Sequence, residues 1–172
     1  AARRCLGWNS RDVLLVAIRV DAPITLVPGV LATDVALRTI CEAVTKAACA
    51  RLESEANELQ AEYRPALTPE GRAGLEAEIY IYDTLPGGAG FAKRVGDIGL
   101  TIFEDALKLL EVCPDNCDRS CYRCLRSYKN KFEHDLLDRH LGASLLRFIL
   151  NNAAPTLSPD RVARSTNLLF ED

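Results

Sequence analysis

The sequence predicts a domain of the α/β class, a small sheet flanked by helices, with an α+β arrangement as the alternative. Two segments with strand character, residues 12–20 and 78–84, are separated by a long segment with helical periodicity. A further helical segment, a four-cysteine loop and a C-terminal helix follow the second strand. The order of strand, helix and strand fits a βαβ-like unit with a right-handed crossover.

Length and composition indicate one globular domain. The chain has 172 residues, of which 48% are hydrophobic and 26% are charged, and its apolar runs are far shorter than the roughly 20 residues of a membrane-spanning helix. The net charge of −3 argues against a polycation that coats nucleic acid, and the N-terminus lacks a signal-peptide pattern. We expect a cytoplasmic protein with no membrane partner. Because the chain contains no methionine, we expect residues 1–172 to be a single domain of a longer protein.

The first half of the chain has a local reason for each predicted element. Residues 12–20 are almost continuously apolar and rich in β-branched side chains, which predicts a strand covered on both faces. A short extended run at residues 24–27 is a candidate to pair with this strand in antiparallel fashion. Thr33 and Asp34 predict the N-cap of a helix that reaches about Glu62, because apolar side chains recur at helical spacing.

The second half predicts a strand, two helices and a short terminal helix. Residues 78–84 alternate isoleucine and tyrosine, as a strand does, and run into a glycine-rich turn. The helical pattern that follows is weakened by Gly96 and Gly99, so we expect a kink or break there. A helix is predicted from about His134 to Asn151, and a last short helix from about Pro159.

Four cysteines between residues 113 and 124 form the strongest chemical signal. Their spacing is C-x3-C-x3-C-x2-C, and the residues are Cys113, Cys117, Cys121 and Cys124. Four thiolates in so short a loop suit a closed tetrahedral Zn²⁺ site, which leaves no position for a reacting water. We favour one structural zinc over an iron–sulfur cluster, and over disulfides or free thiols, because no secretory signal indicates an oxidising compartment. Cys41 and Cys49 are expected to be core residues.

The turn after the second strand offers a structural and a ligand-binding interpretation. It contains Asp83, Pro86, Gly87, Gly88 and Gly90. Glycines before a helix can expose amides to an anion, but no Lys-Ser/Thr pair follows at the spacing of a phosphate-binding loop. We favour a structural loop that lets the helix approach the sheet. Asp83 is expected to cap the turn rather than to act as a catalytic carboxylate.

A basic stretch with interleaved tyrosines follows the cysteines. Such a stretch can contact phosphates and stack on bases, although charges at this density also occur on ordinary surfaces. Some of the arginines also lie close enough to a four-thiolate site to offset its charge. The candidate nucleic-acid-binding residues are Arg119, Arg123, Arg126, Lys129 and Lys131.

The strand and glycine turn at residues 81–90, followed by a helix and a four-cysteine loop, resemble the MrfA-type zinc-binding domain. The resemblance is firm over residues 78–150 and loose over 12–62. That domain occurs near the C-terminus of superfamily 2 helicase-like proteins and in the DrmB component of the DISARM anti-phage system. The resemblance implies zinc ligands at the four loop cysteines. The segment 121–139 is more similar to the defence-associated branch than to MrfA, whose first cysteines lie closer together.

The resemblance implies a non-catalytic structural-zinc domain from the C-terminal part of a larger helicase-type protein. Its partners would be the helicase core, in the same chain or in a partner subunit, and DNA, in DNA repair or anti-phage defence. A second hypothesis is a protein-interaction module that docks the helicase core or a partner subunit. A third is a nuclease that uses Asp83 and nearby acids such as Glu78.

Overall fold

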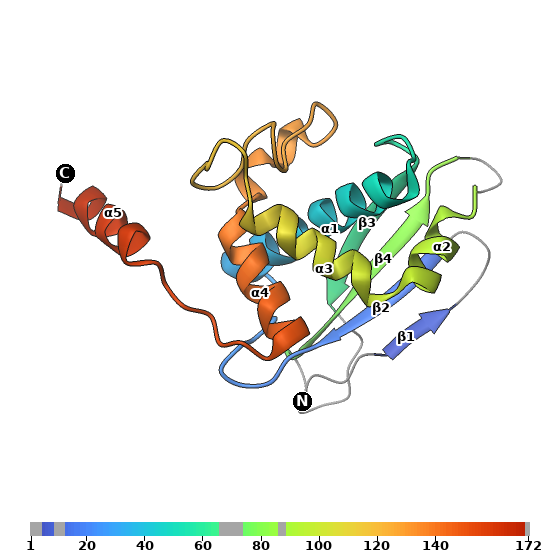
Figure 1. The fold of residues 1–172 in the computed structure, drawn as a ribbon. Helices are drawn as coiled ribbons and strands as arrows, with labels where there is room; N and C mark the ends of the chain where they lie inside the picture. Colours follow the sequence, from blue (N-terminus) through green and yellow to red (C-terminus); the bar gives the residue numbers. More distant parts are fainter. Residues whose placement is uncertain (1–4, 9–12, 66–73, 86–88, 171–172) are drawn as a thin grey trace.

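The computed structural model describes residues 5–8, 13–65, 74–85 and 89–170. Four antiparallel strands form one sheet in the order β1-β2-β4-β3 among these residues, and helices cover it (Figure 1). The strands are β1 (Cys5–Trp8), β2 (Val13–Arg19), β3 (Leu59–Pro65) and β4 (Glu76–Asp83). The helices are α1 (Leu31–Leu52), α2 (Phe91–Ile98), α3 (Leu100–Glu111), the 3-10 helix η1 (Lys131–Leu136), α4 (Arg139–Asn151) and α5 (Pro159–Phe170).

The core lies between the sheet and helix α1. Alternate side chains of β2 and β4 are buried, so that Leu14 and Val16 on β2 face Ile81 and Ile79 on β4. Ile40 near the middle of α1 has no exposed surface and belongs to the same apolar cluster. Helices α3 and α4 pack against α1 and against each other. The predicted small sheet with helices against it is therefore confirmed.

The long helix ends ten residues earlier than predicted, and a strand follows it. Helix α1 stops at Leu52 because Glu53 takes a left-handed conformation with φ 53°, and its N–H bonds to the carbonyl of Cys49. The predicted helix over residues 53–62 was wrong. Within that range β3 begins at Leu59, which is buried together with Ala61. Strand β3 was missed in the sequence because its alternation of apolar and polar residues is short. The glutamates around it are equally typical of a solvent-exposed helix, which the sequence therefore favoured.

The crossover predicted between the two recognised strands was also wrong. Strand β4 is antiparallel to both β2 and β3, so β2 and β3 run in the same direction with β4 between them. Helix α1 thus joins β2 to β3, and the chain turns back to insert β4 in the gap, which is a split βαβ arrangement. With every neighbouring pair antiparallel, the described fold corresponds to the α+β alternative.

Three smaller expectations can be compared with the structure. Residues 24–27 form no strand. The backbone amide of Leu26 donates to the carbonyl of Gly74 (2.5 Å) instead of pairing with β2. The expected break is confirmed at Gly99, where φ is 68° and α2 ends before α3 begins. The last long helix starts at Arg139 rather than His134, because the Asp138 carboxylate caps it by accepting from the amides of His140 and Leu141.

None of the helices among the described residues is long and apolar enough to cross a membrane. Helix α5 extends away from the body in Figure 1. It is tied back by an ion pair of 2.8 Å between Arg161 and the buried carboxylate of Asp138.

The close crossing of α4 over α1 depends on a glycine. A Cβ atom built on Gly142 would lie 2.6 Å from Cγ2 of Thr39 and 3.2 Å from Cδ1 of Leu110. Thr39 cannot move away easily, since it is fully buried and its hydroxyl accepts a hydrogen bond from the backbone amide of Asp138 at 2.9 Å. The sequence gives no sign of this constraint, because Gly142 lies inside a helical pattern.

We predict that Gly142→Ala lowers the free energy of unfolding by about 1–3 kcal/mol through overpacking. Urea denaturation followed by circular dichroism measures this. The double variant Thr39→Ser/Gly142→Ala removes the clashing methyl and keeps the hydroxyl, so it should regain most of the loss. An unchanged stability in the single variant would contradict the close approach.

Candidate metal centre

The thiols of the four loop cysteines converge beyond the end of α3. Cys113 follows that helix by two residues, and the other three lie in the loop after it. The sulfur atoms all lie within 4.8 Å of one another. The Sγ–Sγ distances are 3.6 Å for Cys113–Cys117, 3.5 Å for Cys113–Cys121, 3.6 Å for Cys117–Cys124 and 3.7 Å for Cys121–Cys124. These distances are too long for a disulfide, whose sulfurs lie ~2.05 Å apart.

The donor set and its geometry fit zinc. Bonds of ~2.3 Å from a tetrahedral zinc ion place neighbouring sulfurs ~3.8 Å apart, close to the spacing of the cluster. Each sulfur is a soft ligand of the kind that zinc prefers, and four of them complete its coordination. A bound zinc ion would cross-link the end of α3 to the loop as far as Cys124.

Backbone turns bring the second pair of cysteines together. The carbonyl of Cys121 accepts from the amides of Cys124 (3.2 Å), Leu125 (3.0 Å) and Arg126 (2.9 Å). On the other side, Asn116 donates its amide to the carbonyl of Cys113 at 3.0 Å. Both turns are local, so the short spacing of the cysteines is enough to build the cluster.

The thiols differ in how easily they lose a proton. At Cys113 burial raises the pKa, but amide donors from Cys117 and Asp115 outweigh it and leave the pKa at about 7. Burial raises the pKa of Cys117, as do hydrogen bonds that its protonated thiol makes with the neighbouring cysteine sulfurs, and the pKa of Cys121 is raised in the same way. A zinc ion would lower all of these pKa values, because a coordinating thiol is deprotonated outright.

Arg139 fastens the loop to α3 from the start of α4. This side chain is 6% exposed. Its guanidinium donates to the carbonyl of Cys117 at 2.7 Å, to those of Leu110 and Glu111 at 3.2 Å, and to the side chain of Asn116 at 3.2 Å. Arg139 therefore satisfies carbonyls at the C-terminal end of α3 and orients the ligand-bearing loop at the same time. Sequence reasoning missed this role, because an arginine just after an N-cap aspartate is more often exposed.

Helix α1 holds the far side of the loop. Lys46 donates to the carbonyls of Cys124 (2.8 Å) and Arg126 (3.4 Å), and burial lowers the pKa of its amine. Asn130 is 4% exposed, and its amide donates to Leu125 O and to a carboxylate oxygen of Glu42, each at 3.0 Å. These polar contacts attach the cysteine loop to the body independently of any metal.

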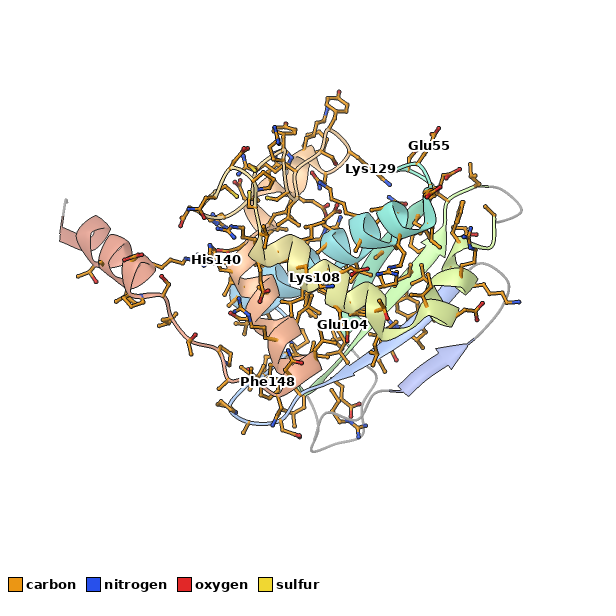
Figure 2. The ribbon with its side chains drawn as sticks, viewed as in Figure 1. Glu55, Glu104, Lys108, Lys129, His140 and Phe148 are labelled. Carbon is orange, nitrogen blue, oxygen red and sulfur yellow. The ribbon has the colours of Figure 1, made fainter. Side chains whose placement is uncertain are left out.

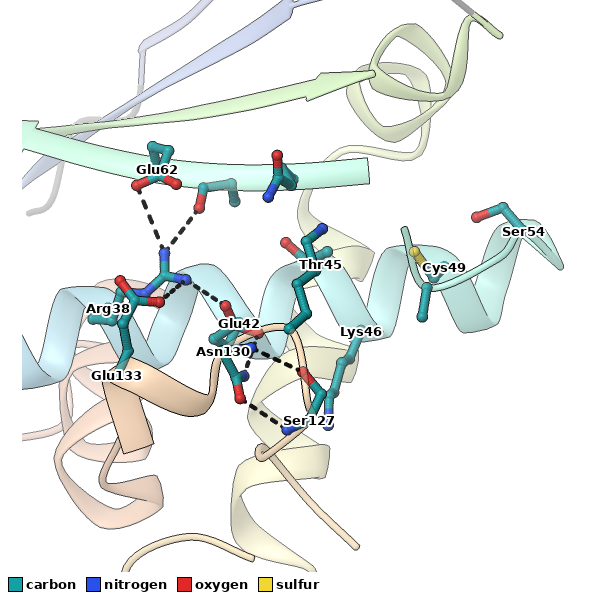
Figure 3. Close-up of a pocket in the computed structure, with 14 residues that line it drawn as sticks. Arg38, Glu42, Thr45, Lys46, Cys49, Ser54, Glu62, Ser127, Asn130 and Glu133 are labelled. Atoms are coloured by element: carbon teal, nitrogen blue, oxygen red, sulfur yellow. Dashed lines mark hydrogen bonds and ion pairs between the residues drawn. The ribbon is translucent and has the colours of Figure 1, made fainter. Parts of the chain in front are cut away.

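A cavity of about 250 Å³ lies between α1, β3 and the segment 127–133. Figure 3 shows Arg38 at one end of it, among three carboxylates. The guanidinium pairs with Glu42 at 2.5 Å and Glu133 at 2.7 Å, and more distantly with Glu62 at 3.7 Å. Burial lowers the pKa of Arg38, but the carboxylates of Glu42 and Glu133 outweigh this effect and raise it. The charged side chains at this end of the cavity are thus paired with one another, and the ion pairs of Arg38 connect α1 to β3 and η1.

The five predicted nucleic-acid contacts differ in their surroundings. Arg123 and Lys129 are exposed, and neither has a side-chain hydrogen bond or ion pair within the described part of the chain. Figure 2 shows Lys129 near Glu55 and away from Lys108 on α3, and Lys129 also lines the cavity beside α1. Arg126 is partly buried and donates to Ser120 at 2.9 Å, so it supports the loop.

The remaining two predicted contacts are exposed but also bonded. Arg119 donates to the carbonyl of Asp135 at 2.8 Å. Lys131 donates to the hydroxyl of Tyr128 at 3.0 Å. That any of the five side chains contacts nucleic acid stays a prediction.

The carboxylate of Asp83 caps the N-terminus of α2, the helix that follows the glycine turn. Its carboxylate accepts from the amides of Gly90 (2.6 Å), Phe91 (3.1 Å) and Ala92 (2.7 Å) at the start of α2. The predicted capping role is therefore confirmed. The carboxylate occupies the position that a bound phosphate would take at a helix N-terminus. Pro86, Gly87 and Gly88 of the predicted loop lie outside the described residues, while Gly90 has φ 75° before the first residue of α2.

Comparison with known proteins identifies the family. Residues 40–125 match the family described as the MrfA Zn-binding domain, and the match covers half of the chain. The chain belongs to the MrfA Zn-binding domain family. The resemblance predicted from the strand, glycine turn and cysteines is thereby confirmed, and so is zinc as the cofactor of a domain whose four cysteines are positioned to hold a metal ion.

Two proteins illustrate the similarity of this MrfA-type domain to known sequences and structures. It is 36% identical over 165 residues to the Druantia protein DruE of Escherichia coli (strain UMEA 4076-1), a match that covers 90% of this chain and 9% of DruE. Its fold is similar to a crystal structure of the helicase MrfA bound to DNA. There the TM-score is 0.53 at 19% identity, over 78% of this chain and 16% of that chain. The chain thus spans a small part of the proteins that it matches.

We predict that the purified domain carries about one zinc per chain by elemental analysis, because four thiolates close one tetrahedral site. Chelation should raise amide hydrogen exchange over residues 113–136 before it does so in the sheet, since metal binding there is local folding free energy. Cys117→Ser should lose zinc, whereas Cys49→Ser, a matched change on α1, should keep it. Equal zinc content in the two variants would contradict the assignment.

We predict that Asp83→Ala lowers the free energy of unfolding by about 1–2 kcal/mol, because the first amides of α2 lose their acceptor. Asp83→Asn keeps an acceptor and should cost less. Asp97→Ala, at an exposed position of α2, removes the same charge without removing a cap. Thermal denaturation of the three variants tests this, and equal midpoints for Asp83→Ala and Asp97→Ala would contradict the capping role.

Proposed function

We propose that this chain is a non-catalytic zinc domain that assists nucleic-acid engagement by a longer helicase-type protein. The observation that carries the proposal is the placement of exposed cationic side chains beside the cysteine cluster: Arg123 lies between its last two cysteines, and Lys129 follows the last one by five residues. DNA is the expected nucleic acid, in a repair or anti-phage defence pathway of the cytoplasm, where free thiols stay reduced.

A structural role for zinc follows from the closed cluster. Four cysteines fill the coordination sphere, so no open position remains for a water or a substrate. The ligands instead connect α3 to the loop, and Arg139 extends that connection to α4 through Cys117 O (2.7 Å). Zinc would stabilise the surface that carries the cations rather than act on a substrate.

The contacts of the candidate acids weigh against a nuclease. The Asp83 carboxylate is engaged by three amides of α2. Glu78 accepts from the Tyr80 hydroxyl and the Arg64 guanidinium, each at 2.7 Å, and these hydrogen bonds lower its pKa. Neither carboxylate belongs to a metal-binding group among the described residues.

Contact with the rest of a longer protein is supported by exposed apolar side chains far from the cysteine loop. Leu31 is 68% exposed and Leu157 is 83% exposed. Leu157 and Val30 line a groove of about 270 Å³ between the start of α1 and the segment after α4. We propose this groove as the side that faces the helicase core or a partner subunit. The MrfA structure similar in fold is that of a helicase bound to DNA.

The proposal predicts salt-dependent DNA binding that depends on two side chains. Arg123→Ala/Lys129→Ala should weaken binding to a fluorescent oligonucleotide, because two phosphate contacts are lost. The slope of log K against log salt should fall by about 1.4 for a single strand. Fluorescence anisotropy at several salt concentrations measures both quantities.

The matched control is Lys93→Ala/Arg94→Ala. It removes one lysine and one arginine from exposed positions of α2, so the net charge changes equally. Affinity and salt slope should then stay close to those of the unmodified chain. Equal weakening by both double variants would show that only net charge matters, and would contradict a specific role of Arg123 and Lys129. Absence of binding by the unmodified, zinc-loaded chain would refute the proposal.

A further inference from the structure

Three large aromatic side chains of the cysteine loop and η1 stand in solvent. Tyr122 is 67% exposed, Tyr128 is 78% exposed and Phe132 is 89% exposed. Single exposed apolar residues are common on protein surfaces. Here, however, three aromatic rings occur within eleven residues of sequence that also carry the exposed cations Arg123, Lys129 and Lys131. Their exposure contributes little to the stability of this domain, so a binding role accounts for them better.

Two of the rings flank one cation. The Lys131 ammonium lies 4.2 Å from the centroid of the Tyr128 ring and 4.9 Å from that of Phe132. It also donates to the Tyr128 hydroxyl at 3.0 Å. A positive charge therefore sits over the rings of two side chains that are themselves largely exposed to solvent.

The support beneath the rings is fixed. The buried side chain of Asn130 accepts from the amide of Ser127 at 2.8 Å and donates to the Leu125 carbonyl at 3.0 Å. The His134 imidazole lies 3.1 Å from both Ser127 O and Asn130 Oδ1. Tyr122 packs edge-on against the His134 ring, with centroids 5.5 Å apart. A surface held in this way loses little conformational freedom when it binds a ligand.

We propose that Tyr128 and Phe132 stack on bases of a single-stranded nucleic acid while Lys131 contacts the phosphate between them. The proposal rests on the proposed function and deepens it by naming the form of nucleic acid. Aromatic rings that alternate with cations are what single strands require, because stacking binds the bases and the cations bind the backbone. In a duplex the base faces are already covered by their neighbours, so these rings would gain nothing from it.

A protein partner fits the same residues less well. The centre of a protein interface is usually depleted of charge and lysine is depleted in it, whereas here a lysine lies between the two most exposed rings. Arg123 and Lys129 are exposed on the same loop. The mixture of separated rings and cations thus favours a polyanion with flat faces.

The test compares three probes of equal length with the zinc-loaded chain in fluorescence anisotropy. They are a thymidine oligonucleotide, the same sugar–phosphate backbone without bases, and a duplex. We expect the thymidine strand to bind at least about 25-fold more tightly than the abasic strand, because each of two stacked bases contributes about fivefold or more. Tyr128→Ala/Phe132→Ala should abolish this difference and leave the affinity for the abasic strand unchanged.

Matched variants separate stacking from loss of apolar surface. Leu100→Ala/Val162→Ala removes two exposed apolar side chains elsewhere and should leave the affinity for all three probes unchanged. Tyr128→Leu/Phe132→Leu keeps apolar side chains of similar size but removes the rings, and should behave like the alanine pair. Zinc content checks that each variant is folded around the cluster.

Each alternative result is distinct. Equal binding of the thymidine and abasic strands, or tighter binding of the duplex, would overturn the stacking proposal and leave the proposed function intact. No binding of any probe would overturn both. A ring variant that binds all three probes normally, but no longer binds the helicase core, would assign the rings to a protein interface and so overturn the proposal.

Discussion

Closure of the four-thiol cluster is the constraint on which the second half of the molecule depends. The loop after α3 has almost no apolar core of its own, and Cys113 and Cys124 are its buried ends, joined by Leu125. Zinc coordination would supply the cross-link that burial does not. The cluster would fix the internal shape of the loop that carries Tyr122 and Arg123, while the hydrogen bonds of Asn130 and His134 hold the segment that carries Tyr128.

Buried polar contacts attach that loop to the rest of the fold. Arg139 donates to Cys117 O and to carbonyls at the end of α3. On the opposite side of the loop, Lys46 of α1 donates to Cys124 O, and Asn130 donates to Leu125 O. A buried arginine or asparagine left without partners would be costly. These contacts therefore specify one orientation of the loop on the body, whereas zinc alone would specify only its internal shape.

The glycine turn illustrates how a motif changes meaning once its neighbours are known. A strand followed by glycines and a helix resembles an anion site, and the helix N-terminus does bind an anion. That anion is the Asp83 carboxylate of the same chain. The Asp83 carboxylate thus fastens the start of α2 to the end of β4.

The local features of this protein were determined by its sequence. The clustering of the four cysteines, the strand predicted over residues 78–84 and the helix break at Gly99 each depend on residues close in sequence. Each of the three was predicted correctly. Strand β3, the insertion of β4 between β2 and β3, and the burial of Arg139 were decided only by the tertiary structure. Those outcomes depend on which distant backbone groups and apolar faces meet. Leu59 and Ala61 are a strand because β4 offers them hydrogen-bond partners and α1 covers them, and neither condition is visible in the residues themselves.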